Sequence, residues 1–331
     1  MTADLAISVQ RSLLSADALA ERLLPEYDLP EGTTCHFWHQ SINDTYLVRA
    51  GATRLMLRVA PAYRRSREQV LAELDLLRYL GQRGILTPQP AALRDGAYVR
   101  ALAAPEGPRH AVLFTFVPGA PFSPTAADSY RYGQAAARFH AMADGYPPDE
   151  AFWRFEAAEM IDRPLELLQP WFADRPDDYA FLVDTAARLR QALASLPRIA
   201  PCYGICHGDL NDNNIHLIGE DAWALLDFEY AGYGWRVFDI ATFFNNQFTQ
   251  RGRTEQTRAM LDAFLNGYQS ERPLSAEELA ALPAFVTLRQ LWNWGVAITN
   301  QAIVGRGLLD HWMFEICLPI FKAWVREPWR A

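Results

Sequence analysis

The sequence predicts an α+β protein in two parts, a small β-rich N-terminal part and a larger, mainly helical C-terminal part. Up to residue 116 the chain consists mostly of short strand-like runs, with a hairpin signal at Gly51 and one amphipathic helix over 66–82. After Pro124 most of the sequence shows the periodicity of helices, and a β-rich stretch over 202–229 interrupts it. The Val-Pro-Gly break within Phe116–Gly119 marks the boundary between the two parts.

The expected elements follow from caps and periodicity. The first helix is expected over 15–24, with Ser15 as its N-cap. Strands are expected over Thr33–Trp38, Thr45–Ala50, Arg54–Ala60, Ala97–Ala104 and Ala111–Phe116. Helices of the second part are expected over 125–143, 156–169, 177–195, 236–249, 254–269, 275–304 and 307–326.

Length, composition and charge exclude several classes of protein. A chain of 331 residues that is 50% hydrophobic and 21% charged is typical of a folded globular protein. Its 31 basic against 39 acidic residues give a net charge of −8, which disfavours nucleic-acid and anionic-membrane partners. No apolar run approaches the roughly 18 residues of a membrane span. The start, MTADLAISVQ, lacks the pattern of a secretory signal, so a cytoplasmic protein is expected.

The most informative segment reads CHGDLNDNN over 206–214 and is followed by LLDFE over 225–229. Two short apolar runs lie between these motifs, and the turn Gly219-Glu220-Asp221 allows the runs to pair as a hairpin. Pairing would bring Asp227, at the end of one run, close to Asn214, at the start of the other.

These residue types suit phosphoryl transfer. The reaction needs a carboxylate that orients an attacking hydroxyl and accepts its proton, and it needs hard oxygen ligands that hold Mg²⁺ against the nucleotide phosphates. Asp209 fits the first requirement. Asn214 and Asp227 fit the second, because Mg²⁺ typically takes one or two carboxylates together with phosphates and water.

The pattern H-x-D-x-x-x-x-N followed by D-F-x resembles the catalytic and metal loops of the aminoglycoside phosphotransferase/choline kinase family, whose fold is protein-kinase-like. The segment GWRVFDIA over 234–241 also looks like the family's G-x-R-x-x-D-L-A, in which the aspartate, Asp239 here, braces the catalytic loop. The resemblance spans 30–330 and is strongest over 205–241. It implies a bilobal kinase-like fold with a nucleotide-binding lobe over 1–116, a hinge over 117–120 and a catalytic and substrate-binding lobe over 121–331.

The resemblance implies an ATP- and Mg²⁺-dependent kinase that phosphorylates a hydroxyl group of a small molecule. Asp209 would be catalytic, Asn214 and Asp227 would bind the metal, and Asp239 would be structural. His207 follows an apolar strand, a position that favours packing over catalysis. The run HGDLNDNN is similar to hydroxylysine-kinase-like members and DFEYAGYGW to homoserine-kinase-like members, so a hydroxylated amine or amino acid is the expected acceptor. Nothing in the sequence points to an oligomeric state.

The resemblance also locates the nucleotide contacts. The polar stretch that contains Ser41 and Asn43 lies between two expected strands, where the family has its phosphate-covering loop. It has no glycine, so backbone N–H groups and these two side chains are the candidate phosphate contacts. The backbone of Phe116 and Val117 matches the family's hinge, which pairs with the adenine edge.

One position departs from the family pattern. Most relatives carry a lysine on the third strand that pairs with a nucleotide phosphate and a helix glutamate. Here Arg58 stands on that strand, and Lys322 is the only lysine of the chain. Glu73, on the following helix, is the candidate partner, and Arg58 is expected to hold phosphate in place of lysine. The alternative is an Arg58 that simply faces solvent on its strand.

Candidates for the acceptor pocket lie after the metal aspartate and on the C-terminal helices. A carboxylate with aromatic rings would suit a cationic amine, whereas Arg289 would suit a substrate carboxylate. The candidate residues are Glu229, Tyr230, Tyr233, Trp235, Arg289, Trp292 and Trp294.

Three other functions compete with a small-molecule kinase. Inactivation of an aminoglycoside antibiotic needs several acidic side chains around the acceptor, and only Glu229 is evident. A protein Ser/Thr kinase needs a long activation segment, but Arg236, the start of the next expected helix, comes nine residues after Asp227. A nucleotide-binding regulator without turnover would not need Asp209.

Overall fold

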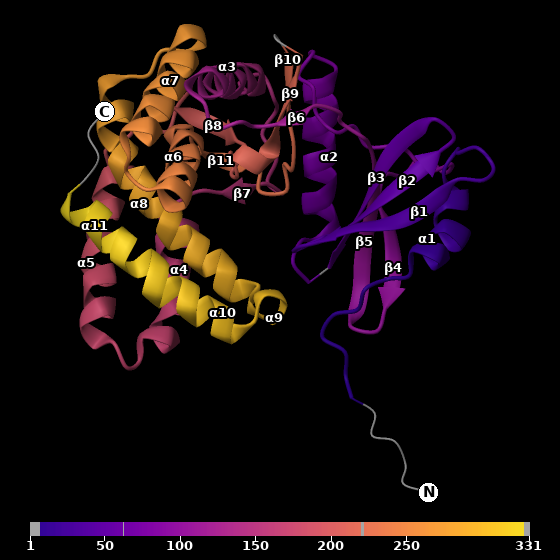
Figure 1. The fold of residues 1–331 in the computed structure, drawn as a ribbon, viewed down its shortest axis with the longest axis horizontal. Helices are drawn as coiled ribbons and strands as arrows, with labels where there is room; N and C mark the ends of the chain where they lie inside the picture. Colours follow the sequence, from indigo (N-terminus) through magenta and orange to yellow (C-terminus); the bar gives the residue numbers. More distant parts are fainter. Residues whose placement is uncertain (1–6, 62, 220–221, 328–331) are drawn as a thin grey trace, which may run out of the picture. The chain divides into compact units, whose positions relative to one another are not determined.

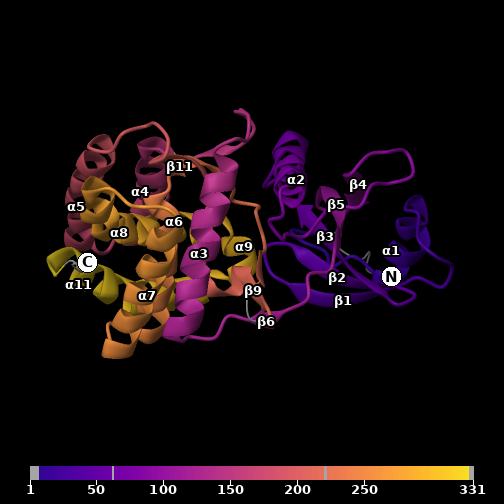
Figure 2. The same ribbon diagram turned by 90° about the horizontal axis from the view of Figure 1, so that it is seen from above.

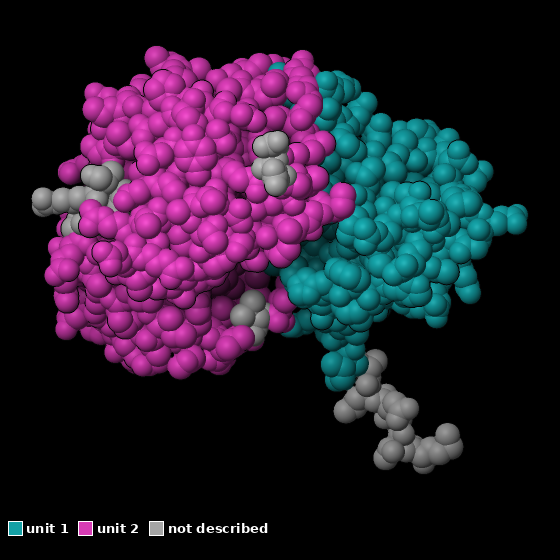
Figure 3. Space-filling model, turned by 45° about the horizontal axis from the view of Figure 1, so that its top comes forward, with its two compact units in different colours: residues 1–82, 87–117 teal, residues 83–86, 118–331 magenta. Residues whose placement is uncertain are grey.

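The computed structural model describes residues 7–61, 63–219 and 222–327. The chain divides into two compact units, one of residues 1–82 and 87–117 and one of residues 83–86 and 118–331 (Figure 3). The N-terminal unit holds the predicted strands and the C-terminal unit is mainly helical, so the predicted α+β fold class is confirmed.

The N-terminal unit is built on a five-stranded antiparallel sheet with the order β1-β2-β3-β5-β4 (Figure 1). Helix α1 lies against one face of the sheet and helix α2 against the other (Figure 1). The elements are α1 (Ala16–Arg22), β1 (Thr34–Gln40), β2 (Asp44–Ala50), β3 (Thr53–Pro61), α2 (Arg67–Gly81), β4 (Arg100–Ala104) and β5 (Gly107–Thr115), with a 3-10 turn over Leu24–Glu26.

Strand β3 alternates between the two faces of its sheet. Leu55, Leu57 and Val59 are buried in the core that the sheet forms with α1. Arg58, between the last two, points to the opposite face, because successive side chains of a strand alternate. Helix α2 covers the face of the sheet to which Arg58 points, so the charged side chain of Arg58 contacts the buried side of α2.

Helix α2 begins at a complete capping box. The Ser66 side chain accepts from the Gln69 backbone N–H, and the Gln69 side chain accepts from the Ser66 N–H. Both bonds satisfy donors that the first turn of a helix leaves without partners, which fixes where α2 starts. Because the start of α2 is fixed, the position of Glu73 along the sheet is fixed as well. Glu73 lies on the buried side of α2.

The C-terminal unit combines long helices with short strands (Figure 1). Two three-stranded sheets have the orders β10-β9-β6 and β7-β11-β8. The strands are β6 (Ala120–Pro121), β7 (Trp153–Arg154), β8 (Tyr203–Cys206), β9 (Ile215–Ile218), β10 (Ala222–Leu225) and β11 (Gly232–Trp235). The helices are α3 (Ala126–Ala143), α4 (Arg163–Leu168), α5 (Pro176–Ala194), α6 (Val237–Arg251), α7 (Glu255–Glu271), α8 (Ala276–Thr299), α9 (Gln301–Val304), α10 (Arg306–Asp310) and α11 (Leu318–Arg326).

Helices α3 and α7 run side by side at close range (Figure 2). A Cβ on Gly133 would come within 2.0 Å of the Phe264 carbonyl oxygen, and one on Gly267 within 2.0 Å of the Tyr130 carbonyl oxygen. Glycine at both positions therefore permits the contact of the two backbones. The close contact also brings His140 of α3 to Tyr268 of α7, which matters for the site below.

Several element boundaries differ from those expected. The helix expected over 275–304 ends at Thr299, and the one expected over 307–326 is interrupted by a π-helical turn over His311–Cys317. The short strands β6, β7 and β11 were not predicted. The last two residues of the expected turn Gly219-Glu220-Asp221 lie outside the described residues, although the strands on either side do pair as predicted. Within the described part of the chain, no helix has the length and apolar character needed to cross a membrane.

Candidate active site

The candidate catalytic loop begins where β8 ends. Gly208 adopts a φ of 81°, and a Cβ there would come within 2.2 Å of the Tyr230 carbonyl oxygen. Only glycine tolerates both the conformation and the contact. The turn at Gly208 sends the chain from Cys206, the buried last residue of β8, to Asp209, which is partly exposed.

Asp239 holds this loop from the first turn of α6. Its carboxylate accepts from the backbone N–H of His207 at 2.7 Å and of Gly208 at 2.8 Å. His140 Nε2 lies 2.9 Å from the same carboxylate, and its Nδ1 lies 2.7 Å from the Tyr268 hydroxyl. Burial raises the pKa of Asp239 and lowers that of His140 well below its usual range. A neutral His140 that donates from Nε2 and accepts at Nδ1 satisfies all of these contacts.

His207 links the catalytic loop to the strand that precedes Asp227. The ring is fully buried and packs 4.3 Å from the Phe228 ring. Its Nε2 lies 2.9 Å from the Leu226 carbonyl oxygen, and its Nδ1 accepts from the Asp209 N–H at 3.3 Å. Burial lowers the pKa of His207, so the neutral ring with its proton on Nε2 fits both bonds. These contacts agree with a structural role.

The structure brings Asp209 and Asn214 into direct contact. Asn214 Nδ2 donates to the Asp209 carbonyl oxygen at 2.8 Å and to Asp209 Oδ2 at 3.0 Å. Asn211 shapes the loop between them, because its Oδ1 accepts from the Asn213 N–H at 2.9 Å and caps the 3-10 turn over Asp212–Asn214.

Asp227 follows β10 in a left-handed conformation, with a φ of 58°. It is the one non-glycine residue with a positive φ in the described part of the chain. The Leu226 N–H donates to the Asn214 carbonyl oxygen at 2.9 Å, so the segment that carries Asp227 is tied to the segment that carries Asn214. Strained backbone of this kind often occurs at functional sites.

Arg289 on α8 contacts the catalytic loop, which sequence reasoning did not foresee. Its Nη2 lies 2.5 Å from Asp209 Oδ1, and its Nη1 donates to the Gly208 carbonyl oxygen at 2.6 Å. The guanidinium carbon lies 4.5 Å from the centre of the Trp292 ring, and the side chain is only 7% exposed. Arg289, expected to meet a substrate carboxylate, is therefore already paired with Asp209.

Aromatic side chains extend from Arg289 towards the segment after Asp227. The Trp292 ring lies 5.1 Å from the Tyr230 ring, which in turn lies 6.1 Å from the Trp153 ring. Trp153 Nε1 donates to the Glu229 carbonyl oxygen at 3.2 Å, and Glu229 is buried. The acceptor candidates Glu229, Tyr230 and Trp292 thus belong to one packed group beside Arg289.

The other aromatic candidates lie elsewhere. Trp235 is 1% exposed and packs against Tyr203, and Trp294 is fully buried, so neither is available to line an acceptor pocket. The Tyr233 hydroxyl donates to the Pro147 carbonyl oxygen at 3.2 Å. These residues belong to the core and its edge, where large aromatic side chains are most often found.

In the N-terminal unit, Arg58 and Glu73 form a two-point ion pair. Arg58 Nη1 lies 2.9 Å from Glu73 Oε1, and Nη2 lies 2.7 Å from Oε2. Arg65, which sequence reasoning did not single out, also binds Glu73 Oε2 at 2.6 Å. Burial opposes ionisation of Glu73, but the charges of Arg58 and Arg65 outweigh it and lower its pKa to about 2. Arg58 therefore faces α2 and not solvent.

The remaining nucleotide candidates lie at turns of the same unit. Residues 41–43 form a tight turn between β1 and β2, closed by a bond from the Ser41 N–H to the Asn43 carbonyl oxygen at 3.0 Å. Phe116 follows β5, and its N–H donates to the Arg54 carbonyl oxygen at 3.4 Å. The N–H of Phe116 is used in this bond. The predicted contact of Phe116 with adenine would therefore involve its carbonyl oxygen, and the backbone of Val117 would make the neighbouring contact.

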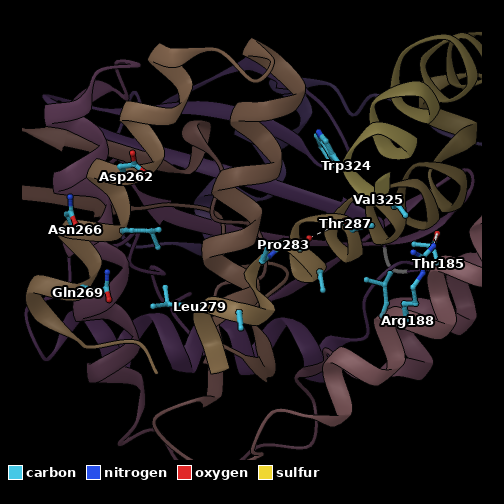
Figure 4. Close-up of a pocket in the computed structure, with 14 residues that line it drawn as sticks. Thr185, Arg188, Asp262, Asn266, Gln269, Leu279, Pro283, Thr287, Trp324 and Val325 are labelled. Atoms are coloured by element: carbon cyan, nitrogen blue, oxygen red, sulfur yellow. Dashed lines mark hydrogen bonds between the residues drawn. The ribbon is translucent and has the colours of Figure 1, made fainter. Parts of the chain in front are cut away.

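A groove of about 910 Å³ lies between α5, α7, α8 and α11 of the C-terminal unit (Figure 4). Arg188 and Asn266 lie at opposite ends of it, with Pro283 between them (Figure 4). None of the described residues that line it belongs to the segment 205–241. Thr287 faces this groove, whereas Arg289, two positions further along α8, faces Asp209, as expected for residues about 200° apart on a helix.

Comparison with known proteins assigns the family. The model of the phosphotransferase enzyme family matches residues 34–274. The chain is similar to a homoserine kinase of Xanthobacter autotrophicus, with 30% identity over 279 residues that cover 81% of each chain. Two solved structures share its fold. A microcompartment-associated aminopropanol kinase has a TM-score of 0.78 at 22% identity, covering 94% of this chain and 98% of that one. An amicoumacin kinase in complex with AMP-PNP, Ca²⁺ and Ami has a TM-score of 0.77 at 23% identity, covering 95% and 94%.

The chain belongs to the phosphotransferase enzyme family. It is a small-molecule kinase, which transfers a phosphoryl group to a hydroxyl group.

Proposed function

We propose that this member of the phosphotransferase enzyme family transfers the γ-phosphoryl group of ATP, with Mg²⁺, to a hydroxyl group of a small hydroxylated amino acid or amine. The observation that carries the proposal is the position of Asp209. Its carboxylate is held on one side by Arg289 and on the other by Asn214, at the tip of a loop that Asp239 braces. A carboxylate held this firmly is suited to orient an incoming hydroxyl.

In the proposed reaction Asp209 accepts the proton of the acceptor hydroxyl. The acceptor oxygen forms a bond to the γ-phosphorus while the bond from that phosphorus to the β–γ bridging oxygen breaks, which releases ADP. Asp239 and His207 do not touch the reactants in this scheme. They hold the loop in place through the backbone of Gly208 and Leu226.

Asn214 and Asp227 supply an amide oxygen and a carboxylate, the hard ligands that Mg²⁺ prefers. No group of three or more His, Cys, Asp or Glu side chains suited to a metal occurs in the part of the chain that the structure describes. Two protein ligands are enough for this ion, because phosphates and water complete its coordination. When bound, Mg²⁺ would neutralise charge on the phosphates.

In the N-terminal unit, Arg58 is the proposed phosphate contact, and Ser41 and Asn43 would cover the phosphates. The Phe116 carbonyl oxygen and Val117 would pair with the adenine edge. The arginine fork gives Arg58 two donors, whereas a lysine would offer a single point charge.

A hydroxylated amino acid is the favoured acceptor because charges of both signs lie near Asp209. Arg289 keeps Asp209 as its partner, and its positive charge beside Asp209 would favour a substrate carboxylate, while Glu229 could pair with a substrate ammonium. Trp292 and Tyr230 add ring faces that also favour an ammonium group. Similarity to homoserine kinase, over 81% of each chain, supports the same class of acceptor.

The proposal is tested by measuring ADP release with a panel of acceptors: homoserine, hydroxylysine, 1-amino-2-propanol, choline and an aminoglycoside. We expect turnover above the rate in water alone for an amino acid of this panel. Asp209→Asn should lower kcat by roughly 10²–10⁴-fold, the usual contribution of a general base. Asp212→Asn is the matched control, because its carboxylate lies in the same loop but pairs with Arg251 at 3.1 Å.

An absence of acceptor-dependent ADP release would refute the proposed activity. Turnover with the aminoglycoside alone would favour an antibiotic kinase instead. If Asp209→Asn retained the turnover of Asp212→Asn, the assignment of the base would be wrong.

A further inference from the structure

The turn between β1 and β2 ends at a buried, charged residue. Asp44 begins β2 directly after residues 41–43, and its side chain is fully buried. Arg109 of β5 places its Nη2 2.7 Å from Asp44 Oδ2, and Arg11 places its Nη2 2.6 Å from Oδ1. A buried carboxylate that is bound on both oxygens has little freedom to move, so this end of the turn is held in place.

The segment that carries Arg11 is itself bound to the sheet. We term it the N-terminal strap, residues 11–14, and α1 begins shortly after it. The Ser12 carbonyl oxygen accepts from Arg109 Nη1 at 2.9 Å, and the Leu14 carbonyl oxygen accepts from the Tyr46 hydroxyl at 2.7 Å. Strands β2 and β5 lie on either side of β3, so the N-terminal strap is fixed across three strands of the sheet.

The charges around Asp44 balance. Glu106 lies 4.0 Å from Arg109, and it accepts from the Ser12 hydroxyl at 2.9 Å. Arg11 and Arg109 therefore face two acids. If Arg11 is removed, Asp44 keeps its contact with Arg109 and is not left as an unpaired buried charge, so a variant without Arg11 is expected to fold.

The contacts of Asp44 lie on the sheet face opposite to Arg58. Asp44 pairs directly with Val59, which is buried in the core that the sheet forms with α1, and directly paired residues share a face. Arg58 precedes Val59 and points to the face that α2 covers. A phosphate that reaches Arg58 therefore leaves the contact between Arg11 and Asp44 intact.

We propose that Arg11 is a positioning residue, which fixes the turn of residues 41–43 over the nucleotide phosphates through its ion pair with Asp44. The inference rests on the proposed role of this turn in nucleotide binding. The turn is closed by the bond from the Ser41 N–H to the Asn43 carbonyl oxygen at 3.0 Å, next to the anchored Asp44. A loop that is ordered before the ligand arrives binds more tightly, because less conformational entropy is then lost on binding.

The test measures binding of AMP-PNP with Mg²⁺ by calorimetry on the full chain, together with kcat and KM for both substrates. Arg11→Met should weaken the affinity for AMP-PNP by roughly 3- to 30-fold, the cost of ordering one or two side chains on binding. The KM for ATP should rise by a similar factor, while kcat and the KM for the acceptor stay unchanged. Arg11→Lys keeps the charge and should recover part of the affinity.

Hydrogen exchange at the turn separates positioning from general damage. Without nucleotide, the backbone amides of residues 40–44 should exchange faster in Arg11→Met than in wild type. Arg100→Met is the matched control, because it removes an arginine of the same unit from its pair with Asp95 at 2.9 Å. Arg100 lies on β4, at the opposite edge of the sheet from β1, so affinity and exchange at the turn should both equal those of wild type.

Two results would overturn the inference. The first is an Arg11→Met variant that melts cooperatively and binds AMP-PNP as wild type does. The second is a loss of affinity without faster exchange at the turn, because the effect would then not act through residues 41–43. Failure of the proposed function is distinguishable: if AMP-PNP does not slow exchange at the turn in wild type, then the turn does not cover the phosphates, whether or not Arg11 fixes it.

Discussion

Removal of the Arg289 guanidinium tests whether α8 holds the candidate catalytic carboxylate. The group makes two short contacts, to Asp209 at 2.5 Å and to the Gly208 carbonyl oxygen at 2.6 Å, and lies over Trp292. Hydrogen bonds to charged groups contribute roughly 1.5–3 kcal/mol each. The Asp209 side chain is 20% exposed and regains some hydration when its partner is lost, so the effect should lie at the low end of that sum. We therefore expect Arg289→Met to lower the free energy of unfolding by about 3 kcal/mol.

The Arg289→Met variant should lose turnover as well as stability. Asp209 Oδ1 loses its fixed partner, and loose placement of a reacting group lowers kcat by roughly 10- to 100-fold. Arg289→Lys keeps the charge but not the fork that reaches two acceptors, so it should recover part of both losses. Arg306→Met is the control, because it removes an arginine from an exposed pair with Asp310 and should cost less than about 1 kcal/mol.

The assays for Arg289 are urea unfolding followed by tryptophan fluorescence and acceptor-dependent ADP release. Free guanidinium added to an Arg289→Ala variant should restore some turnover, which a purely structural loss would not allow. The reasoning is refuted if Arg289→Met unfolds within roughly 0.5 kcal/mol of wild type and keeps its kcat.

Three further predictions concern residues of the C-terminal unit. Asp227→Ala should remove most of the Mg²⁺-dependent gain in AMP-PNP affinity, measured by calorimetry with Mg²⁺ and with EDTA, because a proposed ligand is lost; an unchanged gain would exclude Asp227 as a ligand. Asp239→Asn replaces an acceptor for the N–H groups of His207 and Gly208 by an amide that satisfies them incompletely, so the melting temperature and kcat should both fall, with a stability loss of roughly 2 kcal/mol. His140 is held neutral in the folded state, whereas an unfolded histidine takes up a proton near pH 6.5, so stability should fall by up to about 1.4 kcal/mol per pH unit as the pH drops below that value. His140→Gln should make the urea midpoint less dependent on pH between 7.5 and 5, and an unchanged slope would contradict the assignment.

Long periodic segments and local caps were predictable from the sequence. Ser15 caps α1 as predicted, and α3 lies within one residue of its expected bounds. The two-residue strands β6 and β7 were not predictable, because a strand this short has no period to detect. Both exist only through pairing with distant strands, β6 with β9 and β7 with β11.

The candidate site was predictable where its residues are close in sequence. Asp209, Asn214 and Asp227 come from a single stretch, and their contacts follow from one hairpin and one loop. Their chemical roles remain predictions. The contact of Arg289 with Asp209 joins residues 80 positions apart. The sequence marked Arg289 as a candidate for the acceptor pocket, but no local pattern predicts that it pairs with Asp209.

Arg289 and Arg65 share a geometry that explains why arginine stands at both positions. Each places one Nη on a carboxylate, Asp209 or Glu73, and the other Nη on a backbone carbonyl oxygen, of Gly208 or Gln69. The two acceptors are bound by different Nη groups of one planar guanidinium. A lysine ammonium in the same place would reach only one of the acceptors at a time. Binding to the backbone anchors each guanidinium independently of the acid. The acid is therefore held in a fixed direction, and its partner stays in place if that acid takes up a proton or a second ligand. In a chain with a single lysine, the fork provides the positional control that a point charge would lack.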